Sequence, residues 1–206
     1  GSAAMFANTT GSNNLAFGSS ALYSNTTGGN NAAIGLNALY SNTTGNFNTA
    51  NGVNALHENT TGANNAAIGN NALFSNTTGN SNVAMGTGAL LSNTNQSNLV
   101  AIGDSALFNN GLGATQVWEG TANTAIGSKV LYSNTTGQDN TAVGFWALKA
   151  NTSGYRNTAI GIYALASNTT GSDNTAIGGF QALAFNTTGI FNTAVGSYCL
   201  NNNSTG

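Results

Sequence analysis

The sequence predicts an all-β protein, a parallel β-solenoid (β-roll) of about eleven coils that share one short repeat. Two observations predict this fold. Only 4% of the 206 residues are charged and proline is absent, whereas about 25% of the residues in an ordinary globular domain are charged. An Ala-x-Gly triplet, in which x is mostly Ile or Val, also recurs at a short and nearly constant interval, as it does in solenoids. Its glycines, called the anchors below, are Gly18, Gly35, Gly52, Gly69, Gly86, Gly103, Gly127, Gly144, Gly161, Gly178 and Gly196.

The repeat defines the domain organisation. An anchor at position i is followed by the next at i + 17, except that Gly103 is followed by Gly127 and Gly178 by Gly196. The consensus of this seventeen-position repeat is N-T-A-I-G-x-x-A-L-x-S-N-T-T-G-x-x. We assign residues 14–206 to a single solenoid with a loop inserted within residues 111–122. Residues 1–13 are a cloning scar, Gly1-Ser2, followed by a partial repeat. So short a repeat cannot bury a core alone, so neighbouring coils must share one.

The segment N-T-A-I-G is the predicted strand of each coil, because its β-branched residues are flanked by turn formers. Parallel stacking at about 4.8 Å per coil gives a rod of roughly 50 Å. Both faces of this strand carry apolar residues, which indicates that both are buried. We expect the face with the small residues Asn, Ala and Gly to meet partner chains. The strand alanines are therefore predicted at a trimer interface or in the tightest part of the coil: Ala33, Ala67, Ala101, Ala125, Ala142, Ala159 and Ala176.

The other repeat positions predict the rest of the coil. The Leu four residues after each anchor, or five after Gly178, forms the core row, from Leu22 to Leu200. The Asn of the N-T-T triplet forms a ladder of amides along the stack, and both recurring glycines form corners in left-handed conformations. The segment G-x-x-A-L-x-S-N is compatible with an irregular turn or with a single turn of helix, because its aromatic residues move between positions three apart.

Three of the eight charged residues, Asp139, Arg156 and Asp173, occupy one repeat position in successive coils. With coils in parallel register, Arg156 is expected between the two carboxylates. Such surface pairs are worth at most about 1 kcal/mol each.

Composition and motifs exclude several function classes. The net charge of −2 offers no basic surface for nucleic acid. No apolar run approaches the roughly 18 residues of a membrane span, and no secretion signal is recognised, so any targeting and anchoring parts are expected outside this sequence. The single Cys199 cannot form an internal disulfide. His57 is expected to belong to the aromatic row, and no phosphate loop or metal-ligand spacing is present. The sequence thus predicts neither an enzyme nor a cofactor or metal site.

The recurring A-I-G-x-x-A core with asparagine and glycine corners resembles the head repeats of YadA-like trimeric autotransporter adhesins, and related repeats of trimeric phage tail fibres. The resemblance covers nearly all of residues 14–206. It implies a left-handed β-roll, a homotrimer, and a place on the cell surface or in a virion tail fibre. The family's repeat is shorter than the repeat of this chain, with A-x-A-x-G in place of A-L-x-S-N-T-T-G.

Two functions follow. The first is a non-enzymatic structural or adhesive fibre segment, a head or shaft, that binds a cell-surface glycan or protein or presents a tip. Its predicted ligand-binding residues are Gln116, Trp118 and Glu119 in the inserted loop, because an aromatic ring near a carboxylate suits such recognition. The second is a monomeric ice-binding solenoid, suggested by the threonine-rich repeats. Adjacent threonines such as Thr26 and Thr27 point to opposite faces when extended, which disfavours that function.

Overall fold

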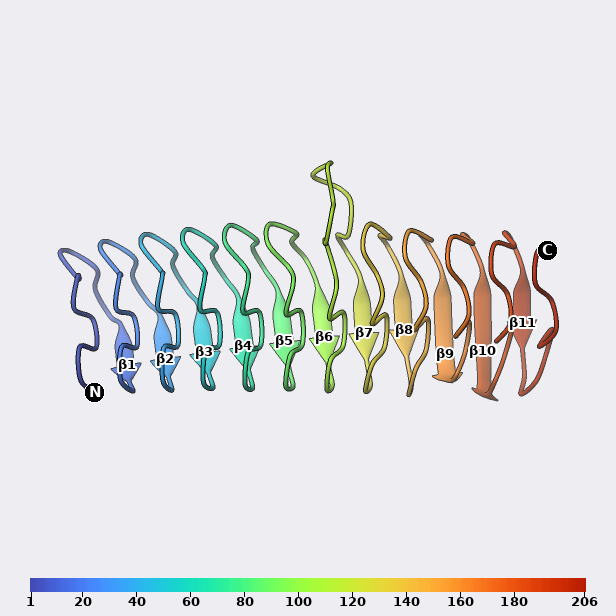
Figure 1. The fold of residues 1–206 in the computed structure, drawn as a ribbon, viewed down its shortest axis with the longest axis horizontal. Helices are drawn as coiled ribbons and strands as arrows, with labels where there is room; N and C mark the ends of the chain where they lie inside the picture. Colours follow the sequence, from blue (N-terminus) through green and yellow to red (C-terminus); the bar gives the residue numbers. More distant parts are fainter.

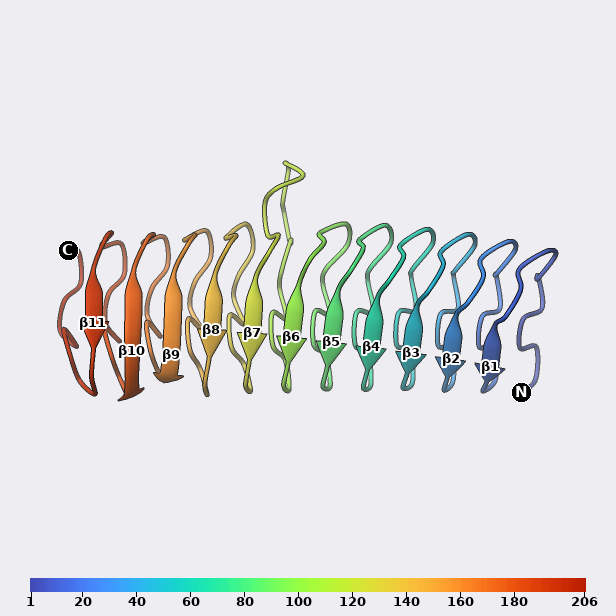
Figure 2. The same ribbon diagram turned by 180° about the vertical axis from the view of Figure 1, so that it is seen from behind.

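The computed structural model describes all 206 residues as a rod of stacked coils, with the two termini at opposite ends (Figure 1). Each coil contributes one short strand, and all strands form a single parallel sheet in chain order. The view from behind shows the same single file of coils (Figure 2). The strands are β1 (Leu15–Phe17), β2 (Ala32–Ile34), β3 (Thr49–Asn51), β4 (Ala66–Ile68), β5 (Val83–Met85), β6 (Val100–Ile102), β7 (Thr124–Ile126), β8 (Thr141–Val143), β9 (Thr158–Ile162), β10 (Thr175–Phe180) and β11 (Thr193–Val195).

The register of the sheet confirms the predicted solenoid. Each strand alanine pairs with the alanine of the next coil, as Ala142 does with Ala159. The pairing holds across the long repeat as well, where Ala101 lies opposite Ala125. The extra residues of that repeat therefore leave the rod as a loop and do not shift the stacking.

Hydrogen bonds join the coils around their whole circumference. Of 139 backbone–backbone hydrogen bonds, only 22 lie within the strands. Many of the others run from one coil to the next through the turns, for example from the Leu22 N–H to the Ala38 carbonyl at 3.0 Å. Residues of the partial repeat stack in the same way, since the Ala7 N–H donates to the Tyr23 carbonyl at 2.9 Å.

The strand alanines occupy the second of their two predicted places, the tightest part of the coil, whereas the expectation that their face meets partner chains was wrong. The central alanine of β2 to β11 is buried inside its own coil, with at most 2% of its surface exposed. The Asn before the strand is also buried, for example Asn140 and Asn157. The small Asn, Ala and Gly residues thus line the tight interior, where only small side chains fit between the strand and the turn, and they do not face a partner. The residues on either side of the alanine face outward, namely the Thr, Ala or Val before it and, in most coils, the Ile or Val after it.

The core consists of two alanine rows and the predicted leucine row. The leucines from Leu22 to Leu183 are fully buried, and only Leu200 at the end of the rod is exposed. No helix forms: the segment after each anchor is an irregular turn, and every leucine of this row has a positive φ between 49° and 54°. A β-branched side chain fits this left-handed backbone poorly. The backbone therefore accounts for a row made of Leu without a single Ile or Val.

This backbone makes a testable prediction for the leucine row. Leu148→Ile conserves volume but places a β-branched residue at a φ of 49°, so we expect it to lower the free energy of unfolding by roughly 2 kcal/mol or more. Leu99 is equally buried but has no positive φ, so Leu99→Ile is the matched control and should lower it by less than about 1.5 kcal/mol. Chemical denaturation of both variants checks this. Equal losses would contradict the backbone explanation.

The two glycines of the repeat have different roles. Every anchor except Gly178 has a positive φ, between 121° and 151°, as predicted for a left-handed corner. The glycine after N-T-T, such as Gly137 or Gly154, has no positive φ, so the prediction was wrong there. A Cβ at that glycine would instead overlap the carbonyl oxygen of the same glycine one coil further on. This corner requires glycine because two backbones approach closely.

Buried asparagines form two ladders through the interior. In the first, which contains the N-T-T asparagines, Asn151 Nδ2 donates to Asn134 Oδ1 at 2.8 Å and to the Gly154 carbonyl at 2.9 Å, while Asn151 Oδ1 accepts from Asn168 Nδ2 at 2.9 Å. In the second, each amide oxygen accepts the backbone N–H of the next asparagine, as from Asn157 to Asn140 at 3.0 Å. The ladders satisfy the amides that the coil buries, except for Asn186 Oδ1 near the C-terminal end.

Candidate functional site

The inserted loop is the one place where the chain leaves the rod, and it projects from one edge between β6 and β7 (Figures 1 and 2). Its base keeps the pattern of a normal corner. Gly111 N–H donates to the Thr135 carbonyl at 2.8 Å, and the Gly120 carbonyl accepts Asn110 Nδ2 at 2.8 Å, as a corner glycine does elsewhere. Residues 112–119 are therefore the part that extends outward.

The coil before the loop has a matching exception at its corner. Gln96 occupies the position of the corner glycine and is buried. Its side chain lies against Gly111 and Gly120 at the base of the loop, so a Cβ at Gly111 would overlap the Gln96 amide. A non-glycine residue fits at this corner because the loop moves the following backbone away. Gln96 and the inserted loop are thus one packing unit.

Inside the loop, Glu119 has a structural role. Its Oε2 accepts the backbone N–H groups of Thr115 at 2.6 Å and Gln116 at 3.0 Å. These bonds lower the pKa of Glu119 below its ordinary value, and the bond from Gln116 contributes most. The Thr121 hydroxyl donates to the Trp118 carbonyl at 2.6 Å and stabilises the segment of the loop that returns to the rod.

Of the three predicted ligand-binding residues, the structure leaves two side chains open to solvent. Trp118 is 56% exposed and Gln116 is also exposed, whereas Glu119 is occupied by backbone donors. The apolar side chains Leu112 and Val117, 59% and 82% exposed, accompany Trp118. The loop therefore presents an apolar surface with an indole ring, beside a carboxylate whose Oε2 is held by the backbone of the loop.

A second exposed surface runs along the sheet. The residue after the strand alanine, one per coil, forms a row that we call the outward row. It is apolar in all coils except the one with Asn51, and six of its members are 37–39% exposed although each packs between neighbours. Its apolar members are Phe17, Ile34, Ile68, Met85, Ile102, Ile126, Val143, Ile160, Ile177 and Val195. The signal was present in the sequence, but deciding which residue points outward required the backbone.

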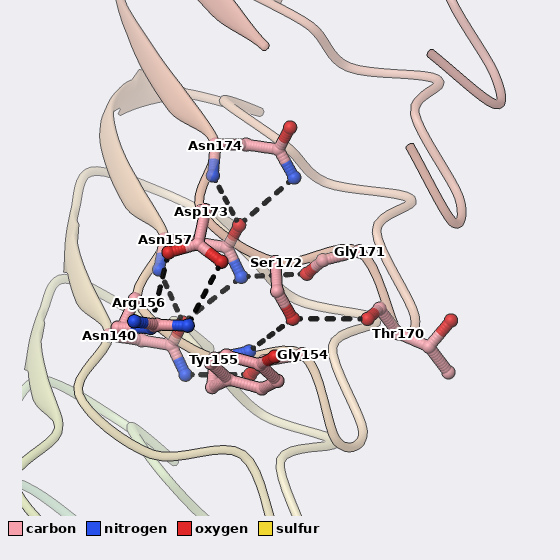
Figure 3. A network of polar contacts seen from close by, with 10 residues as sticks. All are labelled: Asn140, Gly154, Tyr155, Arg156, Asn157, Thr170, Gly171, Ser172, Asp173 and Asn174. Atoms are coloured by element: carbon pink, nitrogen blue, oxygen red, sulfur yellow. Dashed lines mark hydrogen bonds and ion pairs between the residues drawn. The ribbon is translucent and has the colours of Figure 1, made fainter. Parts of the chain in front are cut away.

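The arrangement that the register predicts for the charged residues at this corner is confirmed in part (Figure 3). Arg156 pairs with Asp173, with Nε to Oδ1 at 3.1 Å and Nη2 to Oδ2 at 3.2 Å. No ion pair joins Arg156 to Asp139. The neighbouring Asn140, Asn157 and Asn174 continue the second ladder beneath this pair.

The remaining reactive side chains belong to the stack of rings. His57 lies between the rings of Tyr40 and Phe74, with centroid separations of 5.1 and 5.0 Å, and its Nδ1 is 2.8 Å from Glu58 Oε1.

No three His, Cys, Asp or Glu residues gather as metal ligands would. The structure also contains no helix long and apolar enough to span a bilayer. The N-T-T asparagines from Asn25 to Asn186 are buried in the first ladder, and this leaves them unavailable as glycan acceptors in the folded protein, whereas Asn8 in the partial repeat is half-buried.

No protein-family model matches the chain, and comparisons with curated proteins and with solved structures find no significant match.

Proposed function

We propose that this chain is a segment of a non-enzymatic, homotrimeric fibre at a cell or virion surface, of the kind built from YadA-like head repeats. The observation that carries the proposal is the outward row. It places apolar side chains at the same height in nearly every coil, along the full length of the sheet. Apolar patches of this extent usually mark an interaction surface.

The shape of the outward row indicates which partner it suits. The row is straight and repeats once per coil, and each strand adds only one side chain to it. A second rod with the same repeat can match every member of the row, whereas a compact partner would cover only part of it. Copies of the same chain around an axis satisfy this requirement, and closed symmetry avoids open-ended association.

The ice-binding alternative fits the threonines less well. The first Thr of each N-T-T triplet donates its hydroxyl to the carbonyl of the next coil, as Thr26 does to Thr43 at 3.0 Å. Only the second Thr, such as Thr27 or Thr44, is exposed. One exposed row is a narrower array than paired rows of free hydroxyls, and an ice-binding monomer leaves the outward row unexplained.

The fibre proposal predicts the mass in solution. Light scattering coupled to gel filtration should give three times the 20.6 kDa of a single chain. Ile126→Asp combined with Ile160→Asp should reduce the mass to that of the monomer, because charges would be buried in the interface. Both residues are exposed in the single chain, so the circular dichroism spectrum should stay unchanged.

The matched control is Ile190→Asp. Ile190 is 53% exposed but lies outside the outward row, so its variant should remain trimeric. A wild-type monomer, or a trimer that tolerates both aspartates, would overturn the proposal.

A further inference from the structure

The later coils carry a surface groove of about 460 Å³, separate from the outward row and from the inserted loop. Ala150, Ala166 and Ala184 form part of its apolar lining, together with aromatic side chains of Trp146 and Tyr163. Its volume and its apolar lining with a few polar groups are typical of small-ligand sites.

The groove exists because a stack of rings stops. Five residues after the anchor, the early coils carry rings that stack face to face at centroid separations of 5.0–5.2 Å, from Phe6 to Phe74 and, after an interruption at Leu91, between Phe108 and Tyr132. The equivalent residues of the next coils are Lys149, Ala166 and Ala184. The missing rings leave an open space along the line of the stack, where a planar group can take their place.

Several donors in the groove have no acceptor within the chain, and the amide of Gln181 adds both a donor and an acceptor to its lining. Lys149 Nζ lies 3.4 Å from the centroid of the Trp146 ring and makes no ion pair or hydrogen bond. The Trp146 Nε1–H is buried and has no acceptor. The hydroxyls of Ser133 and Ser167 also line the groove. Only eight residues of the chain are charged, so the ammonium group of Lys149 is the main charge that a ligand would meet there.

We propose that this groove binds an aryl carboxylate, a planar aromatic ring that carries an anionic group. The ring takes the place of the missing rings above Ala166 and Ala184, where it meets apolar methyl groups. The carboxylate pairs with Lys149, whose attraction is strengthened because the groove partly excludes water. This inference does not depend on the trimer, since none of the residues of the outward row lines the groove.

Calorimetric titration of the full chain with 2-naphthoate tests the proposal. We expect saturable binding with a Kd of roughly 0.1–1 mM, in keeping with a ligand of this size in an open groove. Three probes separate the contributions: 2-naphthalenemethanol lacks the charge, cyclohexanecarboxylate lacks the aromatic ring, and glucuronate is an acidic sugar. Each should bind at least tenfold more weakly than 2-naphthoate.

Two variants locate the site. Ala166→Phe restores a ring to the stack and should abolish binding, while its melting temperature stays at or above that of the wild type. Lys149→Met should weaken binding at least tenfold. Lys129→Met removes a cation in the adjacent coil that does not line the groove, and it should change binding less than twofold.

Absence of saturable binding to 2-naphthoate would overturn the proposal, as would equal binding by Ala166→Phe or an equal loss in the two lysine variants. Tighter binding of glucuronate would assign the groove to saccharides and would likewise overturn it.

Discussion

Asn151→Asp should destabilise the rod strongly although it is isosteric. The substitution keeps the size of the side chain but replaces the donating Nδ2 with an oxygen, which then faces Asn134 Oδ1 and the Gly154 carbonyl at hydrogen-bond distance. Two donated bonds are lost, Asn134 Oδ1 is left without a donor while the Gly154 carbonyl keeps only the bond from Asn140 Nδ2, and a charge is placed in a fully buried position. We expect a loss of about 4 kcal/mol in the free energy of unfolding, or roughly 10 °C in melting temperature.

The matched control is Asn70→Asp. Asn70 is exposed and its side chain makes no hydrogen bond, so this variant should differ from the wild type by less than about 0.5 kcal/mol. Thermal unfolding followed by circular dichroism compares the two. If both variants melt together, the asparagine ladder does not hold the interior, and the buried amides must be satisfied in another way.

Excision of the inserted loop should destabilise the protein unless Gln96 is replaced at the same time. Replacing residues 111–122 with Thr-Thr-Gly-Gln-Asp, the corner of residues 135–139, restores the plain repeat. It also returns a corner glycine to the place beside Gln96, where a Cβ overlaps a carbonyl oxygen at every regular corner. We expect the shortened chain to lose about 3 kcal/mol. Gln96→Gly in the shortened chain should recover most of that loss, because it removes the overlap at the corner. Shortening the loop itself changes the entropy of loop closure only slightly.

A double-mutant cycle measures this coupling. The four proteins are the wild type, Gln96→Gly, the shortened chain and the combination, compared by melting temperature and by mass in solution. Gln96→Gly alone should be mildly destabilising, because it empties the space between Gly111 and Gly120. Additive effects would show that Gln96 and the loop are independent. Under the proposed trimer, the combined variant should keep the mass of the wild type, and comparing the two proteins then tests whether the loop that carries Trp118 contributes to surface binding.

The inserted loop shows how far sequence reasoning reached at the candidate sites. Its position followed from the long interval between Gly103 and Gly127 alone. The role of Glu119 did not, because a carboxylate that caps Thr115 and Gln116 reads in the sequence like one that is free for a ligand. The partnership with Gln96 was equally hidden, because the glutamine precedes the loop by a whole coil and only stacking brings the two together.

The sequence by itself determined the solenoid, the register, the leucine core and the asparagine ladder. Each of these depends only on which residues share a repeat position, and parallel stacking turns a shared position into a shared row. The tertiary structure decided which way each row points. Successive residues of a strand point to opposite faces, so the register alone leaves open which of the two faces lies inside the coil. Only the closed coil shows that Ala142 lies inside and Val143 outside. It also shows that the leucines of the core row have a left-handed backbone, and that the second glycine is required because two backbones approach closely rather than because of a turn.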